Sequence, residues 1–372
     1  MSHERIHRFL AEHRPPTPCL VVDTEEVTAR VREFASGLPH ARLRYAVKAN
    51  PEPAVLRAVL AAGGGFDVAS PAEVTACLDA GAAPEVLSYG STIKKPADIA
   101  FAFGCGVREF TTDAASDVDH LAEHAPGSAV SVRVLVDAPA SATPFGRKFG
   151  CAPGEAVALL TKAAELGLDP AGLAFHVGSQ QLDVTAWEAG ISTTAKLFAE
   201  LAAAGIKPRW LNIGGGFGHS YRESAPPLSA YFAAVRGALD AYFPDSAPEL
   251  VLEPGRAIVA GAGLIRTEVV LVAWRGEHRW VYLDIGRYNG LAETENEAIH
   301  YRLDAAGERG PVVLAGPTCD GDDVLYQHTP CELPLALAPG DRLDILDAGA
   351  YTASYSSVSF NGIEPLRTYC LD

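Results

Sequence analysis

The sequence between residues 24 and 256 alternates short β-rich runs with stretches whose apolar residues recur at spacings of three and four. The spaced stretches predict amphipathic helices, and the short runs predict strands. Eight strands are expected, at residues 43–49, 65–70, 86–90, 108–112, 128–137, 171–178, 209–215 and 249–255. Eight strands each followed by a helix, over roughly 230 residues, predict a (β/α)8 TIM-type barrel. An open doubly wound sheet is the alternative, and it usually needs fewer strands.

After residue 256 the pattern changes to strand-like runs separated by turn-rich pieces with little helical periodicity. The run TPCLVVD at residues 17–23 has the same character. We therefore expect an α/β protein with two domains, a barrel of residues 24–256 and a mainly-β domain made of residues 1–23 and 257–372. A chain of 372 residues suits one large domain and a smaller one.

The charge and cysteine content limit the classes of protein that remain. With 46 acidic and 30 basic residues, the net charge of −16 argues against a nucleic-acid surface, which needs clustered Lys and Arg. The chain begins without a long apolar stretch, and no segment is apolar enough to predict a membrane helix. Its seven cysteines are scattered and never spaced as CxxC, which is typical of a reducing compartment. The expectation is a cytoplasmic protein without a metal site.

Chemically active side chains stand where the predicted barrel strands end, and barrel active sites form at the carboxyl ends of strands. Backbone amides of the glycine-rich turn after the seventh strand could approach a phosphate closely, with Arg256 on the next loop. Taken alone, this turn could equally be an ordinary tight turn. The candidates at the strand ends are Lys48, Asp67, His176, Ser179, Gly214, Gly215, Gly216, Glu253, Gly255 and Arg256.

Lys48 lies in the apolar run YAVKAN, where a lysine is costly unless it is paired or used chemically. An ion pair is the simpler interpretation of the residue in isolation. Beside a phosphate site, an imine-forming lysine instead suggests pyridoxal 5'-phosphate. Glu253 could then keep the pyridine nitrogen protonated, and His176 could stack on the ring or be an ordinary core histidine.

Taken together, the motifs YAVKANP, FDVAS, HVGSQ, LNIGGGFG, EPGR, GPTCDGDD and GAYTASYSSVSFNG resemble those of pyridoxal-phosphate decarboxylases with the alanine-racemase-like fold. They cover about residues 20–370 in the same order and spacing. Within that group the chain is similar to the ornithine decarboxylase family, in particular to its bacterial ornithine/lysine type, which also has a segment like residues 285–301.

The resemblance implies a role for each matching residue. Lys48 would carry the cofactor as a Schiff base, with Asp67 nearby, His176 on the ring face and Glu253 on the pyridinium nitrogen. Ser179, Gly216, Arg256 and Tyr351 would hold the phosphate. Cys319 would protonate the substrate carbon after carbon dioxide leaves, Asp320 would bind the distal amino group, and Phe360 would lie near the site.

In the family the counterparts of Cys319 and Asp320 come from the other subunit, so the resemblance implies a homodimer with shared active sites. Lys148 and Asp323 match positions that pair across that interface. From the residues alone, Cys319 could be a small buried apolar side chain, and the acidic run CDGDD could be a solvated turn. Tyr351 could simply belong to the core.

The substrate depends on acidic residues whose place in the family's pattern stays open. A gap-free match puts Glu297 at the family's acidic position in segment 285–301, and a shift would favour Glu293. We expect L-ornithine or L-lysine, because a carboxylate at Asp320 suits a substrate ammonium group. Alternatives are decarboxylation of diaminopimelate, arginine, a D-amino acid or a biosynthetic conjugate, a racemase on the same fold, and a non-enzymatic cofactor-binding regulator.

Overall fold

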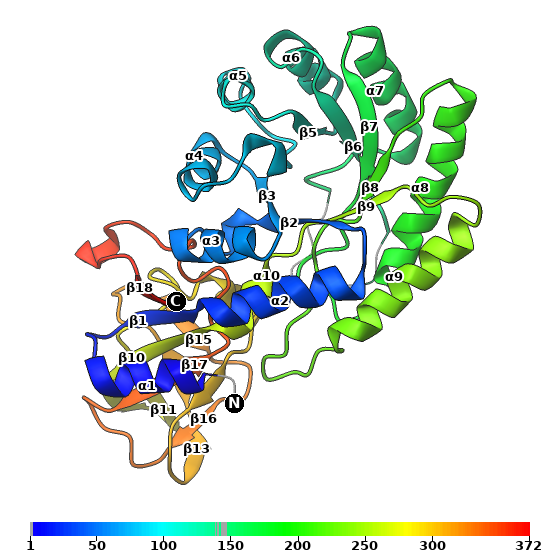
Figure 1. The fold of residues 1–372 in the computed structure, drawn as a ribbon. Coiled ribbons are helices and arrows are strands. Elements are labelled where there is room, and N and C mark those ends of the chain that lie inside the picture. Colours follow the sequence, from blue (N-terminus) through cyan, green and yellow to red (C-terminus); the bar gives the residue numbers. More distant parts are fainter. Residues whose placement is uncertain (1–2, 138, 140, 143–146) are drawn as a thin grey trace.

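The computed structural model describes residues 3–137, 139, 141–142 and 147–372, and it contains a closed barrel of eight parallel strands (Figure 1). Each strand pairs with the next along the chain, and the last pairs with the first. The predicted (β/α)8 fold is therefore confirmed. The barrel strands are β2 (Arg42–Ala46), β3 (Gly65–Val68), β4 (Leu87–Tyr89), β5 (Glu109–Thr112), β6 (Ala129–Arg133), β7 (Asp169–Ala174), β8 (Trp210–Asn212) and β9 (Glu249–Leu252).

The helices that surround the barrel begin at local signals in the sequence. Asp23 and Ser70 cap two of them by accepting hydrogen bonds from backbone amides, and several others have proline in their first turn. Their apolar faces pack on the strands, as Val27, Val31 and Phe34 do. These helices are α2 (Thr24–Gly37), α3 (Pro53–Ala61), α4 (Pro71–Asp79), α5 (Pro96–Gly104), α6 (Ala115–His124), α7 (Pro153–Glu165), α8 (Ala186–Ala203), α9 (Leu228–Tyr242) and α10 (Arg256–Val259).

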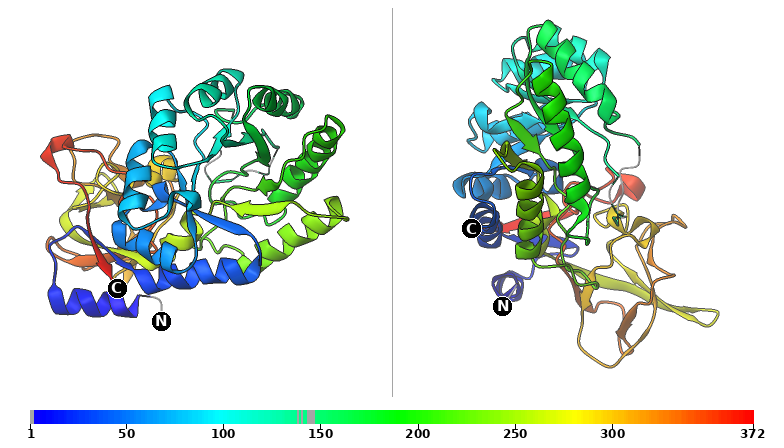
Figure 2. Two further views of the ribbon diagram at one scale, coloured as in Figure 1. Left: turned by 45° about the horizontal axis from the view of Figure 1, so that its top comes forward. Right: turned by 90° about the vertical axis from the view of Figure 1, so that its right-hand side faces the viewer.

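A second sheet forms the mainly-β part of the chain, on one side of the barrel (Figure 2). The order β12-β17-β10-β11-β14-β15 runs across it, and β1 joins it between β10 and β18. Its members are β1 (Cys19–Asp23), β10 (Gly263–Arg275), β11 (His278–Leu283), β12 (Arg302–Asp304), β14 (Val313–Ala315), β15 (Val324–Tyr326), β17 (Arg342–Leu346) and β18 (Arg367–Leu371). Strands β13 (Arg309–Pro311) and β16 (Glu332–Pro334) form a separate pair. The domain boundaries at 23/24 and 256/257 stay a prediction.

The two ends of the described chain meet at the edge of this sheet. Strand β1 runs parallel to β18, with Cys19 opposite Arg367 and Asp23 opposite Leu371. The Thr24 hydroxyl donates to the Leu371 carbonyl, and Arg5 donates to the carbonyl of Asp372. Segments from opposite ends of the chain therefore complete one structural unit.

The structure differs from the sequence-based expectations in one added helix and in where several strands end; β2, β7 and β9 stop at Ala46, Ala174 and Leu252, three or four residues before the predicted ends. Residues Glu4–His13 form a helix, α1, which was not predicted; it buries Ile6 and Leu10 against Cys19, Val21 and Leu264. Strand β6 ends at Arg133, whereas the prediction extended it to residue 137. In the part of the chain that the structure describes, no helix combines the length and apolar character needed to cross a membrane.

Candidate active site

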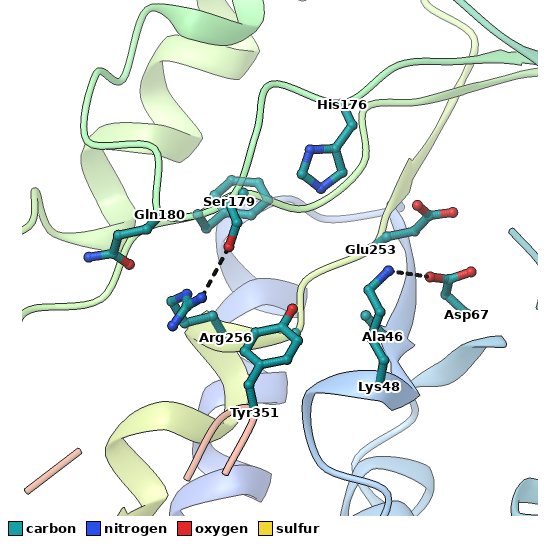
Figure 3. A pocket seen from close by; sticks show the side chains of 12 residues that line it. Ala46, Lys48, Asp67, His176, Ser179, Gln180, Glu253, Arg256 and Tyr351 are labelled. Atoms are coloured by element: carbon teal, nitrogen blue, oxygen red, sulfur yellow. Dashed lines mark hydrogen bonds and ion pairs between the residues drawn. The ribbon is translucent and has the colours of Figure 1, made fainter. Parts of the chain in front are cut away.

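A pocket opens at the carboxyl ends of the barrel strands, and most of the predicted cofactor residues line it (Figure 3). Its wall combines a lysine, an arginine, two carboxylates and a histidine on different strand ends with one tyrosine from the C-terminal part of the chain. The lining residues are Ala46, Lys48, Asp67, His176, Ser179, Gln180, Gly216, Phe217, Glu253, Gly255, Arg256 and Tyr351.

Lys48 lies one turn beyond strand β2, in the short 3-10 helix η1 (Val47–Ala49), and not on the strand itself as predicted. Residues near Tyr351 hold this turn from the other domain. The Tyr351 amide donates to the carbonyl of Ala49 at 2.7 Å, and the Ser354 hydroxyl donates to the carbonyl of Lys48 at 2.6 Å. The backbone of Lys48 is therefore fixed, while its side chain stays 53% exposed to the pocket.

The Lys48 amine points toward Asp67, with 3.9 Å between Nζ and Oδ2 (Figure 3). Shielding from bulk water lowers the pKa of Lys48, but the charges of Asp67, Tyr351 and Glu253 outweigh it, so the pKa is raised overall. Burial and the neighbouring Glu253 raise the pKa of Asp67 well above its usual range. The amine and the carboxylates thus form one coupled charge cluster.

Glu253 follows strand β9, and Asn212 at the end of β8 orients it. The Asn212 side-chain amide donates to Oε1 of Glu253 at 2.5 Å, and its oxygen accepts the Gly214 amide at 2.9 Å. Arg133, at the end of β6, adds a positive charge: burial lowers its pKa, and the charges of Glu253, Asp113 and Asp67 oppose that shift. Sequence reasoning missed Asn212 and Arg133, although both end barrel strands.

His176 faces the same pocket as a neutral imidazole. Burial, together with the positive charges of Arg133 and Lys48, lowers the pKa of His176 well below its usual range. The Gly178 amide lies 2.9 Å from Nδ1, so Nδ1 is the acceptor and the proton of the neutral ring sits on Nε2. A neutral, oriented ring of this kind can stack on a planar cofactor.

The turn after β8 needs glycine for steric reasons. Gly214 and Gly216 have φ angles of 69° and 95°, which disfavour other residues. A Cβ at Gly216 would lie 2.4 Å from the carbonyl oxygen of Gly178, and one at Gly215 would lie 2.4 Å from the carbonyl oxygen of Glu253. Bare backbone therefore faces the pocket, and its amides can approach an anion.

Arg256 begins α10 beside this turn and is almost fully buried. Its guanidinium donates to the Ser179 hydroxyl at 3.2 Å and to the Tyr221 hydroxyl at 2.9 Å. It also donates to both carboxylate oxygens of Glu293, at 2.5 and 2.7 Å. Glu293, one of the predicted substrate carboxylates, therefore pairs with a predicted phosphate residue.

These features fit a bound pyridoxal phosphate. One end of the pocket offers neutral donors, bare backbone and a buried guanidinium for a phosphate, and the other offers an amine and a carboxylate. Two buried polar atoms, Asp67 Oδ1 and Arg256 Nε, have no hydrogen-bond partner among the described residues. Such atoms are normally satisfied by a ligand or by water. Lys48, Asp67, His176, Ser179, Glu253, Arg256 and Tyr351 would hold the group.

Cys319, Asp320 and Phe360 do not line this pocket. They form a separate cluster, in which the rings of Phe360 and Tyr288 stack with centroids 4.5 Å apart and the charge of Asp320 acts on the Tyr288 hydroxyl. Cys319 is exposed there. Within this chain, the cluster is not part of the site around Lys48.

Glu297, the alternative to Glu293 in segment 285–301, is bound to backbone amides. Its oxygens accept the amides of Gln327, His328 and Thr329 at 2.7, 2.8 and 2.5 Å. Partial burial raises the pKa of Glu297, but these hydrogen bonds outweigh it and bring the pKa to about 2. Neither Glu293 nor Glu297 has its carboxylate free in this chain, and a substrate contact by either stays a prediction.

Asp323 organises the loop that carries Cys319. Its carboxylate accepts the Thr318 amide and hydroxyl at 3.0 and 2.7 Å and the Arg287 amide at 2.8 Å. Lys148 is exposed and lies 5.1 Å from the centre of the Phe149 ring. Their pairing across a subunit interface stays a prediction. Among the residues that the structure describes, no group of three or more His, Cys, Asp or Glu could hold a metal ion.

Comparison with known proteins gives a consistent result. Residues 24–260 match the family model of the pyridoxal binding domain of pyridoxal-dependent decarboxylases. The lysine/ornithine decarboxylase of Selenomonas ruminantium is 34% identical over 352 residues, which is 94% of this chain and 88% of that protein. The diaminopimelate decarboxylase of Pseudomonas aeruginosa is 34% identical over 363 residues, 92% and 84% of the two chains.

A solved structure extends the likeness to the whole chain. The lysine/ornithine decarboxylase of Vibrio vulnificus complexed with cadaverine has 30% sequence identity and a TM-score of 0.89, and the match covers 100% of both chains. The barrel, the second sheet and their arrangement are thus shared with that enzyme.

Proposed function

The chain belongs to the pyridoxal-dependent decarboxylases, carboxy-lyases that act on basic amino acids, and we propose that its substrate is L-ornithine or L-lysine. The products would be the corresponding diamine, putrescine or cadaverine, and carbon dioxide. The observation that supports this proposal is the arrangement around the pocket: the Lys48 amine and the Glu253 carboxylate lie opposite an anion site made by Ser179, bare glycine backbone and Arg256.

Pyridoxal phosphate, when bound, supplies an electron-withdrawing ring that stabilises negative charge on the substrate α-carbon. Lys48 would hold the cofactor aldehyde and exchange it for the substrate amine. Asn212 orients Glu253, which would keep a proton on the pyridine nitrogen. The neutral His176 ring would cover one face of the cofactor without adding a positive charge.

The phosphate end would be bound mainly by neutral donors. The Ser179 oxygen already accepts a hydrogen bond from Arg256, so its own proton is free to be donated to the phosphate. Tyr351 completes this end; burial raises its pKa, outweighing the lowering by Lys48 and Arg256, so the phenol stays a donor. Backbone amides of Gly216 and Gly255 would supply the remaining bonds.

We propose Cys319 as the donor in the proton step. When the bond to the carboxylate breaks, carbon dioxide leaves and the electron pair stays on the α-carbon. Cys319 would give its proton to that carbon, and water would later restore the thiol. Because Cys319 and Asp320 lie outside the pocket of their own chain, we propose that the partner in a homodimer supplies both.

Asp320 is the proposed partner of the distal ammonium group of the substrate. It is partly exposed and follows Cys319 directly, and its carboxylate accepts the Asp322 amide at 2.8 Å. Glu293 and Glu297 already bind Arg256 and three backbone amides. This leaves Asp320 as the residue in the best position to bind a terminal ammonium group.

A panel of amino acids tests the proposal. Purified protein with pyridoxal phosphate is given L-ornithine, L-lysine, L-arginine, meso-diaminopimelate and D-lysine, and carbon dioxide and amine are measured. We expect the highest kcat/KM for L-ornithine or L-lysine and no turnover by K48A. Release of amine only from L-arginine, meso-diaminopimelate or D-lysine would refute the proposed substrate. Formation of racemised amino acid without carbon dioxide would refute decarboxylation.

A further inference from the structure

The loop that carries Cys319 is held at the cysteine itself by a side chain from a distant part of the sequence. Asn361 lies in the 3-10 segment η5 (Phe360–Gly362), in the left-handed conformation with a φ of 52°. Its oxygen accepts the backbone amide of Cys319 at 3.4 Å. Its side-chain nitrogen lies 3.3 Å from the Cys319 sulfur, and its oxygen lies 3.6 Å from the same sulfur.

We propose that Asn361 is a positioning residue for Cys319 that directs its proton to the α-carbon of the substrate. The inference rests on the proposed function, because it concerns the residue proposed there as proton donor. It adds a residue that touches neither substrate nor cofactor but decides where the proton goes.

An amide side chain suits both protonation states of the cysteine. The thiol can donate to the Asn361 oxygen, and after proton transfer the thiolate can accept from the Asn361 nitrogen. A hydrogen bond to the charged sulfur is stronger than one between neutral groups, so it favours release of the proton. The bond to the backbone amide limits movement of the loop itself.

Placement of the proton decides the product. A proton on the α-carbon gives the amine, and the cofactor returns to Lys48 in its aldehyde form. A proton on the cofactor carbon that carries the nitrogen moves the double bond to the substrate carbon. Hydrolysis by one water molecule then gives an aldehyde, and the nitrogen stays on the cofactor as pyridoxamine phosphate. The ratio of aldehyde to amine therefore reports where the proton arrives.

Two substitutions separate this role from a general effect on the loop. N361G removes the side chain and tolerates the left-handed backbone. N361D keeps the oxygen that accepts the Cys319 amide but removes the N–H that faces the sulfur. The matched control is S359G: Ser359 is exposed, lies in the same turn with a φ of 65°, and gains the same flexibility.

The ratio of aldehyde to amine is measured on holoenzyme with L-ornithine and L-lysine. We expect an increase of about tenfold or more in N361G and N361D, and the wild-type ratio in S359G. A wild-type ratio in either Asn361 variant overturns the inference. If the wild-type protein releases no carbon dioxide from any amino acid, the proposed function fails instead, and the two failures are distinguished.

A second measurement does not depend on turnover. The S–H stretching band of Cys319, isolated by subtracting the infrared spectrum of C319S, should move to the frequency of a free thiol in N361G. The band should stay in place in S359G. An unchanged band in N361G would show that Asn361 does not bind the sulfur, and would overturn the inference by itself.

Discussion

Both carboxylate oxygens of Glu293 accept hydrogen bonds from the Arg256 guanidinium, at 2.5 and 2.7 Å, and only 3% of the Arg256 side chain is exposed. The pair joins segment 285–301 to the anion site, since the same guanidinium also donates to Ser179. A buried ion pair contributes mainly through geometry, because desolvation offsets much of its attraction. We therefore expect the planar geometry of the Arg256 guanidinium to matter more for this site than its positive charge.

Replacing Arg256 by lysine keeps the charge but removes the planar arrangement that binds both Glu293 oxygens and Ser179. We expect the Kd for pyridoxal phosphate to rise about tenfold, which corresponds to about 1.4 kcal/mol. We also expect the free energy of unfolding to fall by about 2 kcal/mol, because a buried carboxylate loses part of its partner. Cofactor titration and urea unfolding measure the two effects.

The control for that substitution is R30K. Arg30 also pairs with two carboxylates, Glu26 and Glu33, but on the surface of α2, where 34% of its side chain is exposed. For R30K we expect the free energy of unfolding to change by less than about 0.5 kcal/mol. Equal losses of unfolding free energy in R256K and R30K would contradict the claim that the buried Arg256–Glu293 geometry stabilises the protein.

Capture of the cofactor by Lys48 should depend on pH with a definite sign. Bond formation needs the neutral amine, and the carboxylates beside Lys48 raise its pKa. The rate of cofactor binding to apoprotein should therefore increase about tenfold per pH unit below that pKa. D67N removes the nearest carboxylate, so the rate at neutral pH should increase. Stopped-flow absorbance measures the rate, and identical pH profiles for D67N and wild type would refute the coupling.

Glu297 should contribute stability that depends on pH. Its pKa in the folded protein is about 2, below the ordinary 4.5, so the stabilisation is present above about pH 4.5 and is lost as the pH falls toward 2. E297Q should lower the free energy of unfolding at pH 7 by about 1 kcal/mol and lose this pH dependence. E277Q, at an exposed turn between β10 and β11, is the control. A raised KM in E297Q with unchanged stability would instead assign Glu297 to the substrate.

Mixing two inactive variants tests whether subunits share their active sites. K48A lacks the cofactor amine and C319A lacks the proposed proton donor. If Cys319 comes from the partner, half of the mixed dimers' sites are intact, and random exchange restores up to about a quarter of wild-type activity. Amine production after mixing and re-equilibration measures the recovery. No recovery, in a sample shown to contain mixed dimers, would place both residues in the same subunit.

The barrel and most cofactor residues could be predicted because both depend on local patterns. Alternation of strand and helix fixes the carboxyl ends of the strands, and these ends meet at one face whatever the details of packing. Helix α1 could not be predicted in this way. Its few apolar residues, Ile6 and Leu10, pack on Leu264, which lies far along the chain.

The side chains that orient the candidate residues were also outside the reach of sequence patterns. Asn212 and Asn361 are unremarkable amides in the sequence, and their contacts with Glu253 and Cys319 exist only after distant segments come together. The same holds for Glu293: its sequence neighbourhood suggested a substrate contact, whereas the fold brings it to Arg256. Such partners are set by tertiary structure.

The parallel pairing of β1 with β18 has a consequence for the order of folding. All eight barrel strands are contiguous in sequence, so the barrel can form while the rest of the chain is still being synthesised. Strand β1 must wait for β18, and closing so long a loop is slow. The barrel strands can therefore form first, and the turn that carries Lys48 gains its hydrogen bonds from Tyr351 and Ser354 only when the C-terminal part of the chain arrives.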